Sequence, residues 1–158
     1  MLQLHLNNYM KKAIHNKEFF KRVLDEVFQE YKKKLCINAS WTTNTRLRRN
    51  KEVYAEVIYS YKDKLFNIYV NEEKHTNIRT LKDTIIHELC HIMFTPYTSL
   101  TDKLLDTLEK HKFPNIDKKR TQLTEVEEFL VRKFTRVFMQ VEKEKEALQK
   151  EIRQLKKK

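Results

Sequence analysis

The sequence predicts an α+β fold, and three observations carry this prediction. Two short runs rich in β-branched and aromatic residues, at 53–59 and 65–70, indicate strands. Longer segments on either side place apolar residues every three or four positions, which is typical of amphipathic helices. Nine Phe, seven Tyr and one Trp provide the large side chains that a core requires, and 158 residues are enough for one ordinary domain.

The first expected element is a helix from about residue 14 to residue 35. Its apolar residues recur at three- and four-residue spacing, with Lys and Glu between them. These apolar residues are Phe19, Phe20, Val23, Leu24, Val27, Phe28 and Tyr31. The next segment, 38–51, is polar and carries an arginine cluster at 46–49, so we expect a connection there with room for a short strand near Trp41.

Residues 53–70 are expected to form a β-hairpin. The polar stretch Tyr-Lys-Asp-Lys at 61–64 separates the two β-rich runs, as turn residues do between paired strands. Because hairpin strands run in opposite directions, we predict a short antiparallel sheet.

From residue 78 onward the apolar period becomes helical. A buried helix is expected to end near Pro96, because a proline in a helix interior removes a backbone hydrogen bond. We expect a second helix over 100–111 and a third over 123–156, since neither segment contains a helix breaker. The buried helix is marked by Leu81, Ile85, Ile86, Leu89, Ile92 and Met93.

The end of the chain differs from the rest in composition. Residues 142–158 contain seven basic and four acidic residues, but Leu148, Ile152 and Leu155 are their only large apolar ones. These are too few for a coiled-coil seam, so we expect a solvated helical extension and the sequence sets no oligomeric state. The predicted organisation is a single domain over 1–141 followed by a charged helical tail over 142–158.

Composition excludes several classes of protein. The absence of glycine excludes the glycine-rich loops of Rossmann and P-loop proteins and the glycine-flanked nucleophile elbow. Two cysteines cannot form a disulfide framework or a four-cysteine zinc site. No segment has the pattern of a signal peptide or a membrane span, so we expect a soluble cytoplasmic protein with no membrane partner. The formal net charge of +11 predicts that a basic surface meets an acidic partner, such as a nucleic acid, an anionic surface or an acidic protein.

The sequence His-Glu-Leu-Cys-His at 87–91 has the HExxH pattern of zinc sites. Residues four apart share a helical face, so His87 and His91 can direct two imidazoles at one zinc ion. Glu88 lies beside that face, where its carboxylate can take a proton from a water held by the metal as the water attacks a peptide carbonyl. Apolar residues flank the motif, and its polar side chains need partners in such a helix. We therefore predict a zinc site with Glu88 as the catalytic residue.

The segment Leu-Lys-Asp-Thr-Ile-Ile-His-Glu-Leu-Cys-His-Ile-Met-Phe at 81–94 resembles the zincin metallopeptidases. Over roughly 53–138 the chain is similar to the minimal gluzincins and their phage or mobile-element relatives. The resemblance implies a small zincin-like domain that hydrolyses a peptide or protein substrate with zinc. The metzincin branch requires glycine at 94 and histidine at 97, and the Phe94 and Tyr97 of this chain exclude it.

In the gluzincin pattern a later helix supplies the third metal ligand, and the sequence offers three candidates. At about 100° per residue, Glu127 falls within the apolar face of the helix expected over 123–156, whereas Glu125 and Glu128 point away from it. A carboxylate facing the core needs a positive partner, which zinc provides, so Glu127 is the first choice. Glu128 is the second, because a helix phase taken from sequence can be wrong by one residue. His111 is the third, since the SprT-like zincins use a later histidine.

Two functions follow from these features. The first is a zinc-dependent metallopeptidase in which Glu88 activates the water. The second is a non-catalytic zincin-fold protein of phage or mobile-element type that binds nucleic acid or protein. Replacing Glu88 with Gln distinguishes them, because only a peptidase loses its function while retaining its metal.

Overall fold

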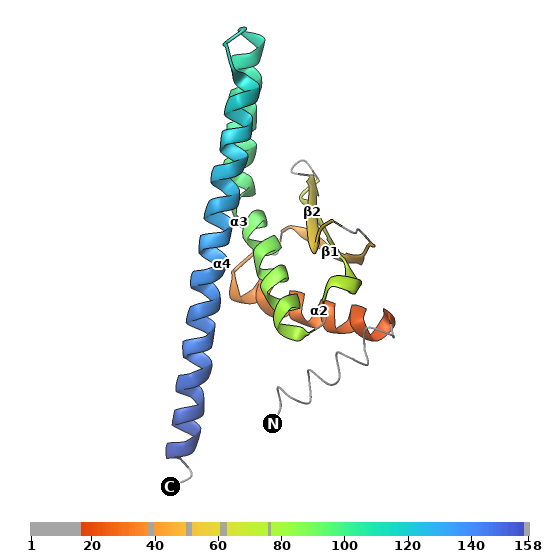
Figure 1. The fold of residues 1–158 in the computed structure, drawn as a ribbon, viewed down its shortest axis with the longest axis vertical. Helices are drawn as coiled ribbons and strands as arrows, with labels where there is room; N and C mark the ends of the chain where they lie inside the picture. Colours follow the sequence, from red (N-terminus) through yellow and green to blue (C-terminus); the bar gives the residue numbers. More distant parts are fainter. Residues whose placement is uncertain (1–16, 38–39, 50–51, 61–62, 76, 157–158) are drawn as a thin grey trace.

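A computed structural model describes residues 17–37, 40–49, 52–60, 63–75 and 77–156. The order of the elements along the chain confirms the α+β prediction (Figure 1). The part of the predicted first helix that precedes residue 17 lies outside the described residues. The elements are α2 (Lys17–Lys34), β1 (Thr42–Leu47), β2 (Ala55–Ser60), β3 (Leu65–Val70), the short 3-10 helix η1 (Glu72–Lys74), α3 (Ile78–Lys110) and α4 (Ile116–Leu155).

The sheet has three strands in the order β1-β3-β2. β2 and β3 pair antiparallel, with Val57 opposite Ile68, which confirms the predicted hairpin. β1 also pairs with β3, but in parallel, with Thr45 opposite Ile68. The sheet is therefore mixed rather than antiparallel as predicted. β1 comes from the polar segment that we expected to be mainly a connection, and it contains a single large apolar residue, Leu47, so its own pattern signals a strand only weakly.

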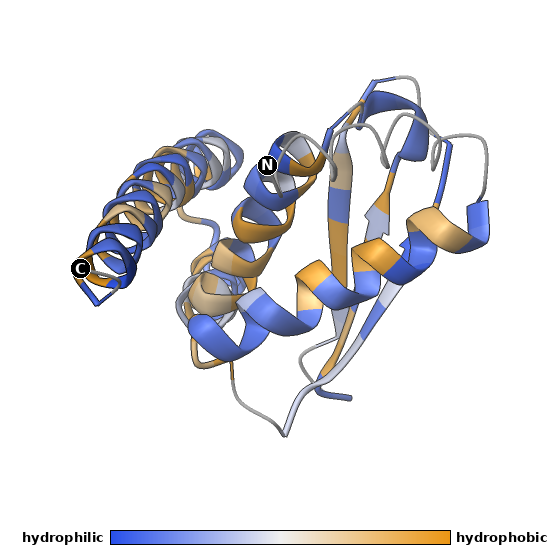
Figure 2. Cartoon of the chain, turned by 90° about the horizontal axis from the view of Figure 1, so that it is seen from below, coloured by the Kyte–Doolittle hydropathy of each residue, from blue (hydrophilic) through white to orange (hydrophobic). Residues whose placement is uncertain are grey.

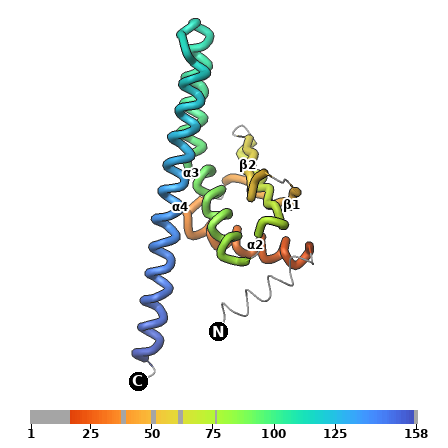
Figure 3. Tube along the Cα trace, viewed as in Figure 1, coloured from red at the N-terminus to blue at the C-terminus, as the bar shows by residue number. Residues whose placement is uncertain are grey.

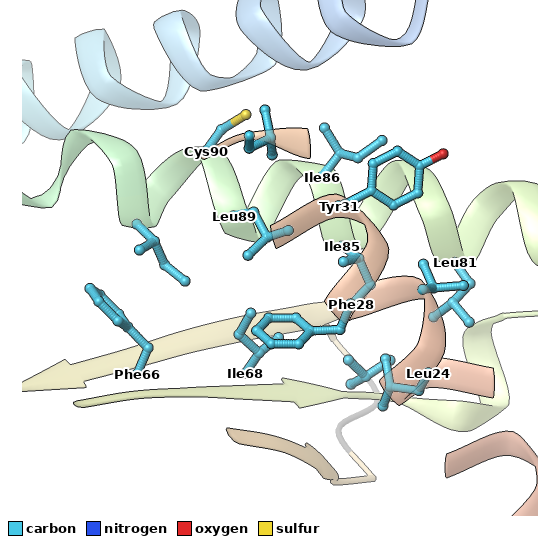
Figure 4. Packing of buried hydrophobic residues seen from close by; sticks show 14 of the residues in the cluster. Leu24, Phe28, Tyr31, Phe66, Ile68, Leu81, Ile85, Ile86, Leu89 and Cys90 are labelled. Atoms are coloured by element: carbon cyan, nitrogen blue, oxygen red, sulfur yellow. The ribbon is translucent and has the colours of Figure 1, made fainter. Parts of the chain in front are cut away.

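The main core lies between one face of this sheet and the helices α2 and α3 (Figures 2 and 4). Alternate residues of β3 point into it, and Phe66, Ile68 and Val70 have no exposed surface. The predicted apolar face of α2 is the one that is buried, with Phe20 and Leu24 almost completely covered. α2 contacts β1 and α3 contacts β2, so the two helices cover the sheet together.

The prediction that a helix ends near Pro96 is wrong, because α3 continues through this residue to Lys110. Pro96 has no N–H to donate within the helix. Hydroxyl groups nearby bond to carbonyls in this stretch: Thr95 Oγ1 donates to the His91 carbonyl at 3.0 Å and Thr98 Oγ1 to the Thr95 carbonyl at 3.1 Å. α3 changes direction partway along its length, as a proline inside a helix causes (Figure 1).

α3 and α4 form an antiparallel helical hairpin (Figure 3). In the connection between them Lys112 and Asn115 adopt left-handed backbone conformations, with φ of 56° and 62°. Arg120 stabilises this end of the hairpin by contacting Asp106 at 2.6 Å and Glu109 at 3.1 Å. α4 begins at Ile116, earlier than the predicted residue 123, because the turn ends there.

The far end of α4 extends beyond the sheet and α2 (Figure 1). All side chains from residue 143 to residue 155 are exposed, as expected for a charged helical extension. Glu142, the first residue of the predicted tail, instead forms an ion pair with Lys34 of α2. None of the helices described in this structure has an apolar stretch long enough to cross a bilayer.

Candidate metal centre

The HExxH residues lie in the first half of α3, as predicted. This helix begins at a side-chain cap, where Asn77 Oδ1 accepts a hydrogen bond from the Thr80 N–H at 2.9 Å. His87 and His91 are one turn apart and their ring centroids are 4.9 Å apart. Both rings are half-buried and face α4, so the spacing of the motif does bring the two imidazoles together.

Glu128 of α4 completes a cluster with the two histidines. Its Oε1 lies 3.1 Å from His91 Nε2, and its Oε2 lies 3.9 Å from His87 Nε2. The two Nε2 atoms are 3.3 Å apart. One atom from each residue can be chosen so that all three lie within 4.8 Å of one another, close enough to bind one metal ion.

These distances and this chemistry fit a zinc ion. Two nitrogen ligands at about 2.0–2.1 Å from a tetrahedral zinc lie about 3.3–3.4 Å apart, which matches the 3.3 Å between the two Nε2 atoms. Two imidazoles and one carboxylate are also a ligand set that zinc prefers in hydrolytic sites. The side chains of His87 and Glu128 are 27% and 37% exposed, so the fourth position can open to solvent.

Glu127 contacts the other side of the His91 ring. Its Oε1 lies 3.0 Å from His91 Nδ1, the ring nitrogen that does not face the cluster. The geometry therefore brings Glu128, our second choice, to the Nε2 side of the histidines, where a third ligand would bind, and brings Glu127, our first choice, to the opposite side of the His91 ring. Glu128 was expected to point away from the apolar face of its helix, but both glutamates reach His91 of α3.

Glu127 favours one tautomer of His91. When Nδ1 carries the proton, this N–H donates to the Glu127 carboxylate and the Nε2 lone pair is free for a metal. Burial opposes protonation of His91, but the hydrogen bond from Glu127 and the charges of Glu88 and Glu128 outweigh it and raise the pKa of His91. Burial and the neighbouring His91 lower the pKa of His87, which favours the neutral, metal-binding form of that ring.

Glu88 is buried next to the cluster, with 6% of its surface exposed. The pKa of Glu88 is raised from 4.5 to about 7, mainly by burial and to a lesser extent by the charges of Glu128 and of Glu56 on β2, against the opposing effect of His91. A carboxyl with a pKa near neutrality is suited to take up and release a proton during a reaction. Glu88 is therefore a buried carboxyl beside the two histidines whose pKa suits proton transfer, and its role as general base stays a prediction.

The third candidate ligand, His111, is remote from the cluster. It caps the C-terminal end of α3, twenty residues after His91, which is about 30 Å along a helix. Sequence reasoning also missed Arg132, whose Nε lies 3.3 Å from Glu128 Oε2. The spacing of Glu128 and Arg132, four residues apart on one helix, was a signal that could have revealed this ion pair.

Other residues singled out in the sequence have structural contacts. Cys90 is completely buried and its sulfur accepts a hydrogen bond from Thr135 Oγ1 at 3.8 Å, which agrees with a core position. The arginine cluster at 46–49 is exposed except for Leu47, and Arg48 and Arg49 are paired with glutamates.

Comparison with known proteins adds no assignment to this geometry. No protein-family model, no curated protein and no solved structure matches the chain.

Proposed function

We propose that this chain is a zinc-dependent peptidase in which His87, His91 and Glu128 hold the metal and Glu88 is the general base. One observation carries the proposal: three ligand atoms from two helices converge at zinc-like spacing beside a buried glutamate. A lone HExxH pattern occurs by chance in many chains. A third ligand that converges from a separate helix is not part of that pattern, so it supports the proposal independently.

The roles of the residues follow from their positions. Bound zinc would supply a water of lowered pKa and would polarise the substrate carbonyl. Glu88 would accept the proton that the attacking water loses and would pass it to the amide nitrogen of the leaving amine as the C–N bond breaks. Glu127 keeps His91 in the tautomer that binds metal, and Arg132 holds Glu128 in place.

A peptide or protein is the substrate class that this chemistry implies. The non-catalytic alternative, a zincin-fold protein that binds nucleic acid or protein, uses the same metal site structurally and relies on the net charge of +11. Both native cysteines, Cys36 and Cys90, are free thiols, which is typical of the reducing cytoplasm where we propose that the protein acts.

The experiment combines metal content with hydrolysis. The purified full chain is incubated with unfolded casein and with quenched-fluorescence peptide mixtures, before and after removal of zinc with a chelator. We expect hydrolysis that is lost on chelation and restored by zinc. Glu88→Gln should keep one zinc per chain and reduce the rate by roughly 10²–10⁴-fold. Glu125→Gln, an exposed residue of α4, is the matched control and should change neither quantity.

Three results would contradict the proposal. If the chain binds no zinc after reconstitution, the metal site is wrong. If it binds zinc but neither the native chain nor Glu125→Gln hydrolyses any substrate, the non-catalytic alternative is favoured. If Glu88→Gln hydrolyses substrate as fast as the native chain, Glu88 is not the general base.

A further inference from the structure

A stripe of exposed apolar side chains follows α4 along most of its length. With about 100° of rotation around the helix axis per residue, its members lie within a sector of about 80°. The centre of this sector points roughly 90–100° away from Val131, which is buried and packs against the core. Each is between 40% and 69% exposed. The stripe consists of Leu123, Val126, Leu130, Phe134, Val137, Val141, Leu148, Ile152 and Leu155.

The stripe continues onto α3 in the helical hairpin. Tyr97, Leu100 and Leu104 are 58–70% exposed and lie on the same side of the α3–α4 contact. Together these side chains expose on the order of 1,000 Å² of largely apolar surface, whereas the largest patch on a typical monomer is about 300–600 Å². A stable interface buries about 800 Å² per partner, so this surface is large enough to form one.

Eight of the nine members of the stripe are spaced symmetrically about its centre. Without Phe134, which faces Glu144 in the alignment given next, these eight are separated by 3, 4, 7, 4, 7, 4 and 3 residues, a series that is the same in both directions. Two antiparallel copies of α4 can therefore be aligned so that apolar residues face apolar residues. In this alignment the numbers of two residues that face each other always add up to 278. Leu123 then faces Leu155, Val126 faces Ile152, Leu130 faces Leu148, and Val137 faces Val141.

The charges of α4 also suit this alignment. From residue 123 to residue 155 there are seven basic and seven acidic residues, so two copies do not repel one another here although the whole chain carries +11. Lys133 and Glu144 lie on the same border of the stripe. In the aligned pair, Glu144 of one copy faces residue 134 of the other copy, which is the neighbour of Lys133. The two side chains are therefore close enough to form an ion pair, and the symmetry gives two such pairs.

We propose that this chain forms a homodimer through α4, with the two helices antiparallel and residues 123–155 paired in the alignment that sums to 278. The same patch is used by both copies, as a two-fold axis requires, and the axis passes near residue 139. The charged end of each α4 then lies on the other copy's α3–α4 hairpin, where it covers Leu100 and Leu104. This role explains why an otherwise solvated extension retains Leu148, Ile152 and Leu155.

Mass in solution tests the dimer. Sedimentation equilibrium of the full chain should give twice the monomer mass of 19.4 kDa. Val137→Glu places a charge at two symmetric positions in the centre of the interface and should weaken the dimer roughly a hundredfold or more. Gln149→Glu is the matched control, because Gln149 is exposed on the same helix but points about 100° away from the stripe. It should leave the mass unchanged, and circular dichroism should show that both variants remain helical.

Disulfide trapping tests the alignment, in a Cys36→Ser background that removes the exposed native thiol. Leu130→Cys and Leu148→Cys chains should cross-link to each other when mixed and oxidised. Leu130→Cys alone should not cross-link, because Leu130 of the two copies lie about 27 Å apart along the helix axis.

Charge exchange gives an independent readout. Lys133→Glu and Glu144→Lys should each weaken the dimer, and the double variant should restore it. A native chain that sediments as a monomer, a Val137→Glu chain that remains dimeric, or cross-linking of Leu130→Cys to itself would overturn the proposal. A native chain that is monomeric alone but captured by another protein would also overturn it.

Discussion

Replacing Glu128 with Gln is expected to weaken zinc binding much more than replacing Glu127 with Gln. Glu128 faces the Nε2 atoms of both histidines, at 3.1 Å and 3.9 Å, so the amide removes the charge of a direct ligand. Glu127 contacts only Nδ1 of His91, at 3.0 Å, so its amide weakens a ligand without removing one.

The magnitudes follow from these contacts. Loss of a carboxylate behind a ligand typically costs about 10–100-fold in metal affinity, or about 1.4–2.8 kcal/mol. We expect this range for Glu127→Gln. Loss of one of three protein ligands should exceed it, so we expect more than about 100-fold for Glu128→Gln.

The assay is competition for zinc with a chromophoric chelator at about pH 7. Glu125→Gln is the matched control, because Glu125 is exposed on the same helix, and it should bind zinc like the native chain. His111→Ala should also be unaffected, since His111 caps the far end of α3. A larger loss for Glu127→Gln than for Glu128→Gln would refute the reasoning, and a loss confined to His111→Ala would refute the site.

Two further predictions concern stability. In metal-free protein the pKa of Glu88 is about 7 in the folded chain and about 4.5 in the unfolded chain. Between these two pH values the folded chain keeps a proton that the unfolded chain has released, so the free energy of unfolding should fall by about 3 kcal/mol as pH rises through this interval. Thermal melts in chelator at about pH 5 and pH 8 should show a larger decrease in the native chain than in Glu88→Gln, where the raised pKa of His91 still contributes a decrease of its own; equal decreases would contradict the assignment. Deleting residues 143–158 removes only exposed side chains and keeps the ion pair between Lys34 and Glu142, so the zinc content and the melting temperature of the monomer should stay nearly unchanged. The same deletion removes Leu148, Ile152 and Leu155 from the proposed interface, so the dimer should be lost. A deletion variant that unfolds would instead place the end of α4 in the monomer core.

Local sequence patterns predicted much of the fold. The helix α2, the hairpin of β2 and β3, and a helix carrying residues 87–91 each have a strong period or a turn signal of their own. The end of α4 has little apolar surface and is exposed as expected. These features depend on neighbours in sequence, so the sequence specifies them directly.

Features that depend on distant contacts were missed or only partly predicted. A short strand near Trp41 was predicted, and β1 begins at Thr42, but its parallel pairing with the free edge of β3 was not predicted. α3 continues past Pro96 although proline usually ends a helix. Its packing against α4 on both sides of this residue outweighs one lost hydrogen bond, as the contact between Phe94 and Phe134 illustrates.

The candidate site divides in the same way. The sequence by itself determined that His87 and His91 share a helical face with Glu88 beside it, because this depends only on helix geometry. It also determined that a carboxylate near residue 127 would face α3. Only the tertiary structure decided which carboxylate meets which nitrogen. Neighbouring residues on a helix differ by about 100°, and the His91 ring lies between Glu127 and Glu128, so the choice depends on how α3 and α4 are rotated and shifted against each other.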